Sequence, residues 1–282
     1  MTFQDSLSAA IFAGVVAIAV TLLIERYGGA VGGILGTVPT TIVPAAAGIA
    51  LASNNYSDLN TSLAIVPAGM LINGIFLANW RILPTYFNDT EKIYTTLFII
   101  TLISLSIWSL CGLIILKIIQ ISYDLSLSSF QIGLIGQILL TILGVVMSWR
   151  IGLTPRGKNK VNKYVVFSRG IMAAIAIGVA VWISSLGYPL LAGLASVFPA
   201  IFLTSMVALW ISQGPSVPMG AVGPMILGGA SVGVYAIVAM WALPNFGILL
   251  GSIITWSLAV IFWSIPCFQF VKWRQDNSLN SI

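Results

Sequence analysis

The chain of 282 residues is too apolar for a soluble protein. Hydrophobic residues make up 59% of it, charged residues 7%, and the mean hydropathy is +1.04, whereas soluble globular chains are about 45–50% apolar and about 25% charged. The composition therefore predicts an integral membrane protein whose first partner is the lipid bilayer. The net charge of +5 bears on orientation in the membrane, and no nucleic-acid partner is expected.

The residue types that build metal sites and catalytic centres are scarce in the sequence. The chain has no histidine, and its two cysteines, Cys111 and Cys267, lie apart in apolar runs. We therefore expect no disulfide, no metal site and no cofactor. The sequence clusters no Asp, Glu, His or Cys that would supply a general base or a nucleophile at depth, so an intramembrane enzyme is the least favoured class of function.

Apolar windows long enough to cross a bilayer, about 20 residues each, recur along the chain. They predict nine membrane spans, near residues 8–25, 30–52, 61–80, 94–116, 129–149, 168–186, 189–212, 218–241 and 247–271. No basic residue precedes the first window, so we expect a mature helix there and not a cleaved signal peptide. The predicted fold class is an all-α, polytopic integral membrane protein.

The second window carries helix-breaking residues in its middle. Glycines, threonines and two prolines crowd residues 28–52. Pro39 lacks an N–H group, and its ring opposes the carbonyl four residues earlier. Since hydrocarbon cannot satisfy the backbone groups that such a break frees, we expect this helix to be interrupted near Pro39, where protein, water or a ligand supplies the partners.

The same pattern recurs 160 residues later, so that matched residues pair as Gly33 with Gly193, Gly36 with Ser196, Pro39 with Pro199, and Leu83-Pro84 with Leu243-Pro244. Matched breaks in two halves of a membrane protein indicate a transporter binding site. The alternative is that these residues only allow helices to pack closely, because Gly and Pro are common in membrane helices.

The distribution of basic residues predicts one orientation. With the basic loop at residues 150–169 in the cytoplasm, the N-terminus lies outside and the C-terminus inside. Of the 12 basic residues only Lys117 then lies outside, and the others lie on the cytoplasmic side: Arg26, Arg81, Lys92, Arg150, Arg156, Lys158, Lys160, Lys163, Arg169, Lys272 and Arg274. This distribution follows the positive-inside rule.

Nine spans in this orientation predict an inverted 4+1+4 repeat. Residues 1–127 form the first four-helix repeat, residues 128–165 a linker helix with the basic cytoplasmic loop, and residues 166–282 the second four-helix repeat. The interrupted spans, the second and the seventh, enter from opposite faces and each reach their proline after about 10 residues, or roughly 15 Å. The two breaks are therefore expected to meet at mid-depth, as alternating access requires.

Hydrogen-bonding groups near the breaks are the candidate binding residues. A half-helix that begins after each proline presents free amides and the positive end of its dipole, which favours an anion or a polar acceptor. The predicted substrate-binding residues are Gly33, Gly36, Thr37, Pro39, Thr40, Thr41, Asn73, Gly193, Ser196, Pro199, Thr204 and Ser205. The hydroxyls among them have an alternative, a bond to the carbonyl four residues earlier in their own helix.

Other polar and aromatic residues have simpler explanations. Asn73, Asn79, Gln131 and Gln137 are expected to form interhelical hydrogen bonds by default, and Asn73, beside the broken helix, is the first to test. Glu25 and Arg26 form an interfacial pair or, alternatively, serve ion coupling. Of the tryptophans, Trp80, Trp149, Trp241 and Trp273 fall near predicted membrane faces, where an aromatic belt accounts for them.

The second half resembles the GlpM-like family of small four-helix bacterial inner-membrane proteins. The resemblance rests on Tyr188, residues 191–194 (Leu-Ala-Gly-Leu), Phe198-Pro199, Leu243-Pro244, Gly247 and Trp256-x-Leu-Ala259. The first half looks like a diverged copy, so the chain resembles a tandem of two such units. This resemblance implies a bacterial inner-membrane location and allows a homodimer, and it carries no activity with it.

These observations predict a bacterial inner-membrane transporter that passes a small polar or anionic solute through a midplane site formed by the two interrupted helices. The alternative is a non-transporting membrane scaffold, such as an accessory subunit of an envelope polysaccharide system, in which the glycines serve packing.

Overall fold

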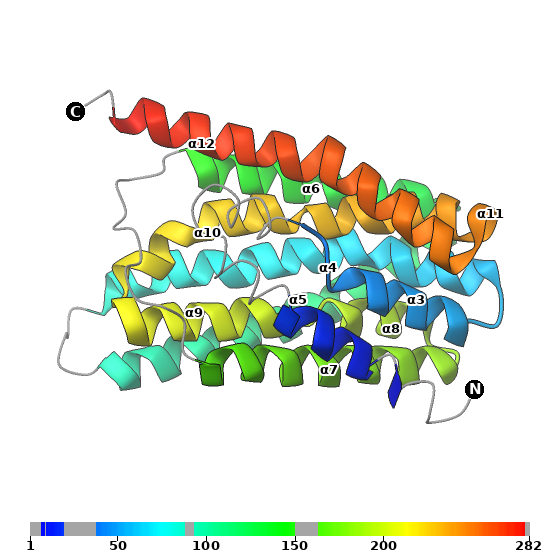
Figure 1. Ribbon diagram of the computed structural model, residues 1–282, viewed down its shortest axis with the longest axis horizontal. Coiled ribbons are helices and arrows are strands. Elements are labelled where there is room, and N and C mark those ends of the chain that lie inside the picture. The colour runs from blue at the N-terminus through cyan, green and yellow to red at the C-terminus, as the bar shows by residue number, and fades with distance from the viewer. Residues whose placement is uncertain (1–6, 9, 20–37, 88–92, 150–162, 280–282) are drawn as a thin grey trace.

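The fold was analysed in a computed structural model, which describes residues 7–8, 10–19, 38–87, 93–149 and 163–279. Within these ranges every regular element is a helix. The long helices lie roughly parallel or antiparallel to one axis and form a single bundle (Figure 1). The predicted all-α class is therefore confirmed.

The helices follow one another with short connections. After the short helix Ala10–Ala19 they are α3 (Ile42–Ala52), α4 (Tyr56–Ile82) with the 3-10 turn η1 (Leu83–Tyr86), α5 (Ile93–Asp124), α6 (Ser129–Trp149), α7 (Lys163–Ser185), α8 (Pro189–Ser196), α9 (Ala200–Gln213), α10 (Ser216–Gly229), α11 (Ser231–Ala259), the π-helical turn η3 (Val260–Ser264) and α12 (Ile265–Leu279).

Six helical stretches in the described residues are long and apolar enough to cross a membrane: Tyr56–Tyr86, Ile93–Asp124, Ser129–Trp149, Val166–Ser185, Pro189–Ile211 and Ser216–Arg274. They support a multi-pass membrane protein. The count of nine spans and the 4+1+4 arrangement stay predictions, because α3 has only 11 residues and the segment before it, residues 20–37, lies outside the described residues.

The last stretch, Ser216–Arg274, doubles back on itself at Gly247 (Figure 1). Gly247 has φ 73° and ψ 173°, a backbone conformation that is essentially restricted to glycine. The two arms then pack against each other, because a Cβ added to Gly251 would lie 2.8 Å from the carbonyl oxygen of Ala242. This turn falls between the predicted eighth and ninth spans.

The helix α4 forms the centre of the bundle. Of its apolar window 83% is buried inside the protein, against 22–39% for the other five stretches, and it contacts α5, α6, α8, α10 and α11. A helix that is apolar all round is suited to this position. The belt position predicted for Trp80 is wrong: its side chain is 0% exposed, because the Trp210 ring of α9 covers it at 6.1 Å.

The helices that contain the two proline breaks run in opposite directions. α3 starts inside the bundle and runs toward the end where α4 begins, whereas α8 and α9 start near that end and run away from it (Figure 1). α3 also contacts α8. The same opposition holds between α4 and the first arm of the α10–α11 hairpin, which contact each other as well.

Basic residues gather at one end of the described bundle, which we call the basic end. Arg81 near the end of α4, Lys163 at the start of α7, and Lys272 and Arg274 in α12 lie there (Figure 1). Arg81 donates to the carbonyl oxygen of Met147 at 2.7 Å. Lys117, late in α5, lies toward the other end.

Candidate functional site

The break between α8 and α9 lies at Pro199. Pro199 has no N–H to continue the helix, and the chain turns so that the Ala200 N–H donates to the carbonyl oxygen of Phe198 at 2.7 Å. α9 begins at Ala200, and no side chain among the described residues caps it. The sequence therefore interrupts this crossing where Pro199 predicts.

The same turn occurs at the start of α3. The Thr40 N–H donates to the carbonyl oxygen of Val38 at 2.9 Å, around Pro39. These residues are the counterparts of Ala200, Phe198 and Pro199 at the offset of 160. Thr41 precedes the helix, and within the described part of the chain α3 likewise has no side-chain cap.

A buried amide holds the α8–α9 break from the side of α4. The Asn73 side-chain nitrogen donates to the carbonyl oxygen of Val197 at 2.8 Å and contacts the sulfur of Met70 at 3.4 Å. The Asn73 oxygen accepts from the Trp108 indole nitrogen at 2.7 Å. With Asn73 only 2% exposed and Trp108 9% exposed, these bonds are shielded from solvent, and the freed Val197 carbonyl has a partner in protein.

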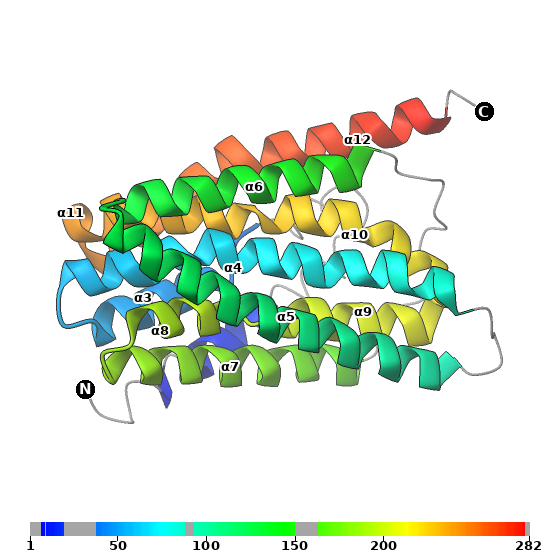
Figure 2. The ribbon, with the colours of Figure 1, turned by 180° about the vertical axis from the view of Figure 1, so that it is seen from behind.

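Trp108 also packs against the break. It comes from α5, which crosses α8 and α9 on the face shown in Figure 2. The Trp108 and Phe198 rings meet edge to face, with centroids 5.3 Å apart and planes at 79°, an arrangement that aromatic pairs prefer. Asn73, Trp108, Val197 and Phe198 thus form one cluster on three segments, which we call the Asn73 cluster.

The hydroxyls predicted to bind solute mostly bond within their own helices. Ser196 donates to the carbonyl oxygen of Gly193 at 2.6 Å, Thr204 to that of Ala200 at 2.9 Å, and Ser205 to that of Ile201 at 2.6 Å. Their hydrogens are therefore used locally, as the alternative explanation expects. The donors that remain for a solute are the backbone amides of the first turns of α3 and α9.

The remaining predicted residues divide between packing and the first break. Gly193 allows close approach of α8 to α4, because an added Cβ would collide with the carbonyl oxygen of Ser62. Pro39 is buried, and Thr40 and Thr41 are half-buried at the start of α3. Three further predicted residues lie outside the described residues: Gly33, Gly36 and Thr37.

A second buried amide serves the junction of α10 and α11. The Gln137 side-chain nitrogen, from α6, donates to the carbonyl oxygen of Ala230 at 3.2 Å. Its side-chain oxygen lies over Gly233, where a Cβ would collide with it. Gly233 is the counterpart of Asn73 at the offset of 160, so an amide from the linker helix occupies the place that a side chain has in the first half.

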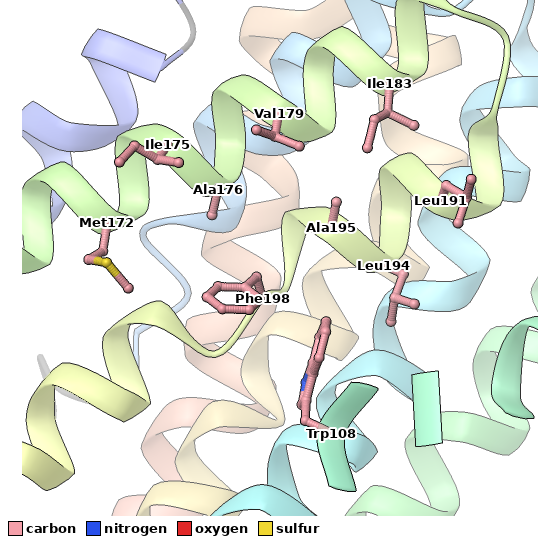
Figure 3. A pocket seen from close by; sticks show the side chains of 10 residues that line it. All are labelled: Trp108, Met172, Ile175, Ala176, Val179, Ile183, Leu191, Leu194, Ala195 and Phe198. Carbon is pink, nitrogen blue, oxygen red and sulfur yellow. The ribbon is translucent and has the colours of Figure 1, made fainter. Parts of the chain in front are cut away.

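An apolar groove borders the Asn73 cluster. Its volume is about 400 Å³, and ten side chains from α5, α7, α8 and the break line it, all labelled in Figure 3. Trp108 and Phe198 form part of its inner wall. Among the described residues no group of three or more His, Cys, Asp or Glu could hold a metal ion.

Sequence reasoning identified Asn73 but missed its partners. Trp108 was one of several unassigned tryptophans, and Val197 contributes only a backbone carbonyl, which carries no side-chain signal. The available signal was depth: Trp108 sits in the middle of α5, away from the interfaces where tryptophan normally gathers, so its N–H needs an internal partner.

Comparison with family models, with curated proteins and with solved structures finds no match for the chain. The resemblance of its second half to the GlpM-like family therefore stays a prediction.

Proposed function

We propose that the chain is a bacterial inner-membrane transporter that passes a small polar or anionic solute between the starts of α3 and α9. One observation carries this proposal: the same proline turn, with the same backbone hydrogen bond, begins both helices 160 residues apart. The two helices run in opposite directions from these turns (Figure 1).

The solute class follows from the groups at the two turns. The first amides of a helix have no partner within the helix, and the helix dipole places about half a positive charge there. In the described residues neither start is capped by a side chain, so a solute with acceptor oxygens, or a simple anion, complements both. Hydrocarbon around the bundle would leave these amides unsatisfied.

The proposed transport cycle uses an inverted 4+1+4 repeat of nine spans, with the N-terminus outside and the C-terminus in the cytoplasm. The opposed directions of α3 and α8–α9, and of α4 and the first arm of the hairpin, support this arrangement. In inverted-repeat transporters, one repeat moves against the other around a fixed midplane site. Asn73 would then steady the α8–α9 break in the state described here, through its bond to Val197.

Flux through proteoliposomes tests the proposal. Chloride, phosphate, acetate and glycerol are suitable probes, compared between the wild type and the double variant Pro39→Ala/Pro199→Ala, whose new N–H groups allow the helices to continue. We expect at least one probe to cross faster than in protein-free vesicles, and the double variant to lose that flux. Pro189→Ala is the matched control, because Pro189 occupies the first turn of α8, where no N–H is needed. Flux that survives the double substitution would remove the site assignment.

A scaffold without transport activity is the second candidate. Two observations favour it: Ser196, Thr204 and Ser205 use their hydroxyls within their own helices, and Gly193 serves the close contact of α8 with α4. A scaffold needs no water at the breaks. It therefore predicts that all four probes cross at the rate of protein-free vesicles, and that thiols placed at the breaks stay unreactive toward polar reagents.

A further inference from the structure

The groove beside the Asn73 cluster opens sideways from the bundle. Its rim residues on α7 and α8 are exposed: Ile175 is 60% exposed, and Val179 and Leu191 are exposed as well. Both α7 and the α8–α9 segment are candidate membrane spans, so these rim side chains face lipid. Any molecule that enters from this side comes from the hydrocarbon of the bilayer.

The lining selects a hydrocarbon ligand. Apart from the sulfur of Met172 and the indole nitrogen of Trp108, every lining side chain consists of carbon alone. The indole N–H points to Asn73, to which it donates, so it is not offered to an occupant. A polar solute would lose its hydration here without any compensating hydrogen bond.

The length of the groove matches one leaflet. On α7 its lining extends from Met172 to Ile183 (Figure 3), which is about 16 Å of helix. The hydrocarbon core of a bilayer is about 30 Å thick, so one acyl chain extends over about half of it. The groove reaches from the middle of α7 toward the end away from the basic end, as a chain anchored in that leaflet would. Its volume, about 400 Å³, is within the usual range of ligand sites, about 300–1,000 Å³.

We propose that this groove binds an acyl chain of a membrane lipid from the leaflet opposite the basic end. The chain contacts Trp108 and Phe198, the two rings that pack against the α8–α9 break. Because Trp108 donates to Asn73, and Asn73 holds the Val197 carbonyl, a bound chain stabilises the break. This inference does not depend on transport: a scaffold could bind the chain equally well.

Photo-crosslinking of the full-length protein in vesicles tests the proposal. The probe is a phospholipid with a diazirine in the middle of one acyl chain, and adducts are mapped by mass spectrometry. We expect adducts on Trp108 and Phe198, which line the inner wall, in addition to adducts on Leu113, which is 63% exposed on α5 and reports the surrounding lipid. An absence of adducts on Trp108 and Phe198 while Leu113 reacts would overturn the proposal.

Filling the groove gives the specific control. Ala176→Phe on α7 and Ala195→Leu on α8 each place bulk in the lining, and each should reduce the inner-wall adducts at least tenfold relative to those on Leu113. Ser106→Phe, at an exposed position of α5 outside the lining, should leave the ratio unchanged. Equal ratios in the wild type and the filled variants would contradict the proposal, as would crosslinking of the groove to a second copy of the chain.

Two further measurements keep the test decisive if a filled variant does not fold. Unlabelled palmitate added to the wild type should lower the inner-wall adducts and leave those on Leu113 unchanged; equal loss at both places would contradict a site. Stripping lipid from the wild type should at least double the amide exchange rate over residues 197–203, which the bound chain stabilises. Exchange that does not respond to lipid would remove the coupling to the break.

Discussion

The side-chain nitrogen of Asn73 donates a hydrogen bond to the carbonyl oxygen of Val197, 124 residues further along the chain, at 2.8 Å. This bond joins the most buried helix of the bundle to the point where α8 ends. A break in a membrane helix frees carbonyl groups that lipid cannot satisfy. The Asn73 cluster satisfies one of them with protein, and its members are therefore the first targets for substitution.

Asn73→Leu should destabilise the protein strongly. Leucine has a similar shape but leaves both the Val197 carbonyl and the Trp108 indole N–H without their partner, at about 1–3 kcal/mol for each buried group. Thermal unfolding of the purified protein in detergent measures the loss. Asn79→Leu on the same helix is the control, because the Asn79 side-chain nitrogen has no hydrogen-bond partner among the described residues. Equal unfolding midpoints for the two variants would contradict this role of Asn73.

Substitutions of Trp108 separate its hydrogen bond from its packing. Trp108→Phe retains a ring against Phe198 but removes the donor to Asn73, so we expect a loss of about 1–3 kcal/mol in the free energy of unfolding. Trp108→Ala also leaves a cavity and should cost more, about 3–5 kcal/mol. The same unfolding assay ranks the two. If Trp108→Phe unfolds like the wild type, the indole hydrogen bond does not contribute.

Gly193→Ala should separate α8 from α4. The added methyl group would collide with the carbonyl oxygen of Ser62, which is part of the backbone and cannot turn away, and such overpacking costs about 1–3 kcal/mol. Gly112→Ala is the matched control, because its methyl group would meet only the tip of the Leu194 side chain, at 3.3 Å. We expect the unfolding midpoint to fall for the first variant and to change little for the second. The reverse order would mean that α8 does not need this close contact.

Gly247→Ala tests the turn that folds Ser216–Arg274 into a hairpin. At φ 73° and ψ 173° an alanine is strained by about 1–3 kcal/mol. Asn245→Ala, two residues earlier, removes only an exposed side-chain bond to the Trp241 carbonyl of the same helix and should change stability by less than about 0.5 kcal/mol. Equal unfolding of both variants would show that the turn relaxes to another conformation without cost.

The backbone of the site could be predicted further than its contacts. Pro39 and Pro199 indicated both turns, because the missing N–H and the ring of proline act locally. Asn73 could be singled out as a buried amide beside a broken helix. Its partners could not, because the Val197 carbonyl and the Trp108 indole come from segments whose approach depends on the packing of the whole bundle. For the same reason Trp80, placed by its position near a helix end, proved to lie under Trp210.

The hydroxyl groups show a similar limit. Ser196, Thr204 and Ser205 lie beside the α8–α9 break, as the repeat pattern predicts, yet each bonds a carbonyl three or four residues earlier. The sequence placed them correctly along the chain but could not decide between a solute and the local carbonyl. Gln137 was expected to bond between helices, and it does so at the junction of α10 and α11.

The most direct test of the central claim is side-specific thiol labelling at the two proline turns. Thr40→Cys and Ser196→Cys are made singly in a chain in which Cys111 and Cys267 are replaced by alanine, with Ser106→Cys, exposed toward lipid on α5, as the unreactive control. A charged, membrane-impermeant methanethiosulfonate is added to one side of sealed vesicles and then to the other. The account predicts that both break positions react, each from either side, while Ser106→Cys does not. Break positions that stay as unreactive as Ser106→Cys from both sides would contradict a solute site between α3 and α9.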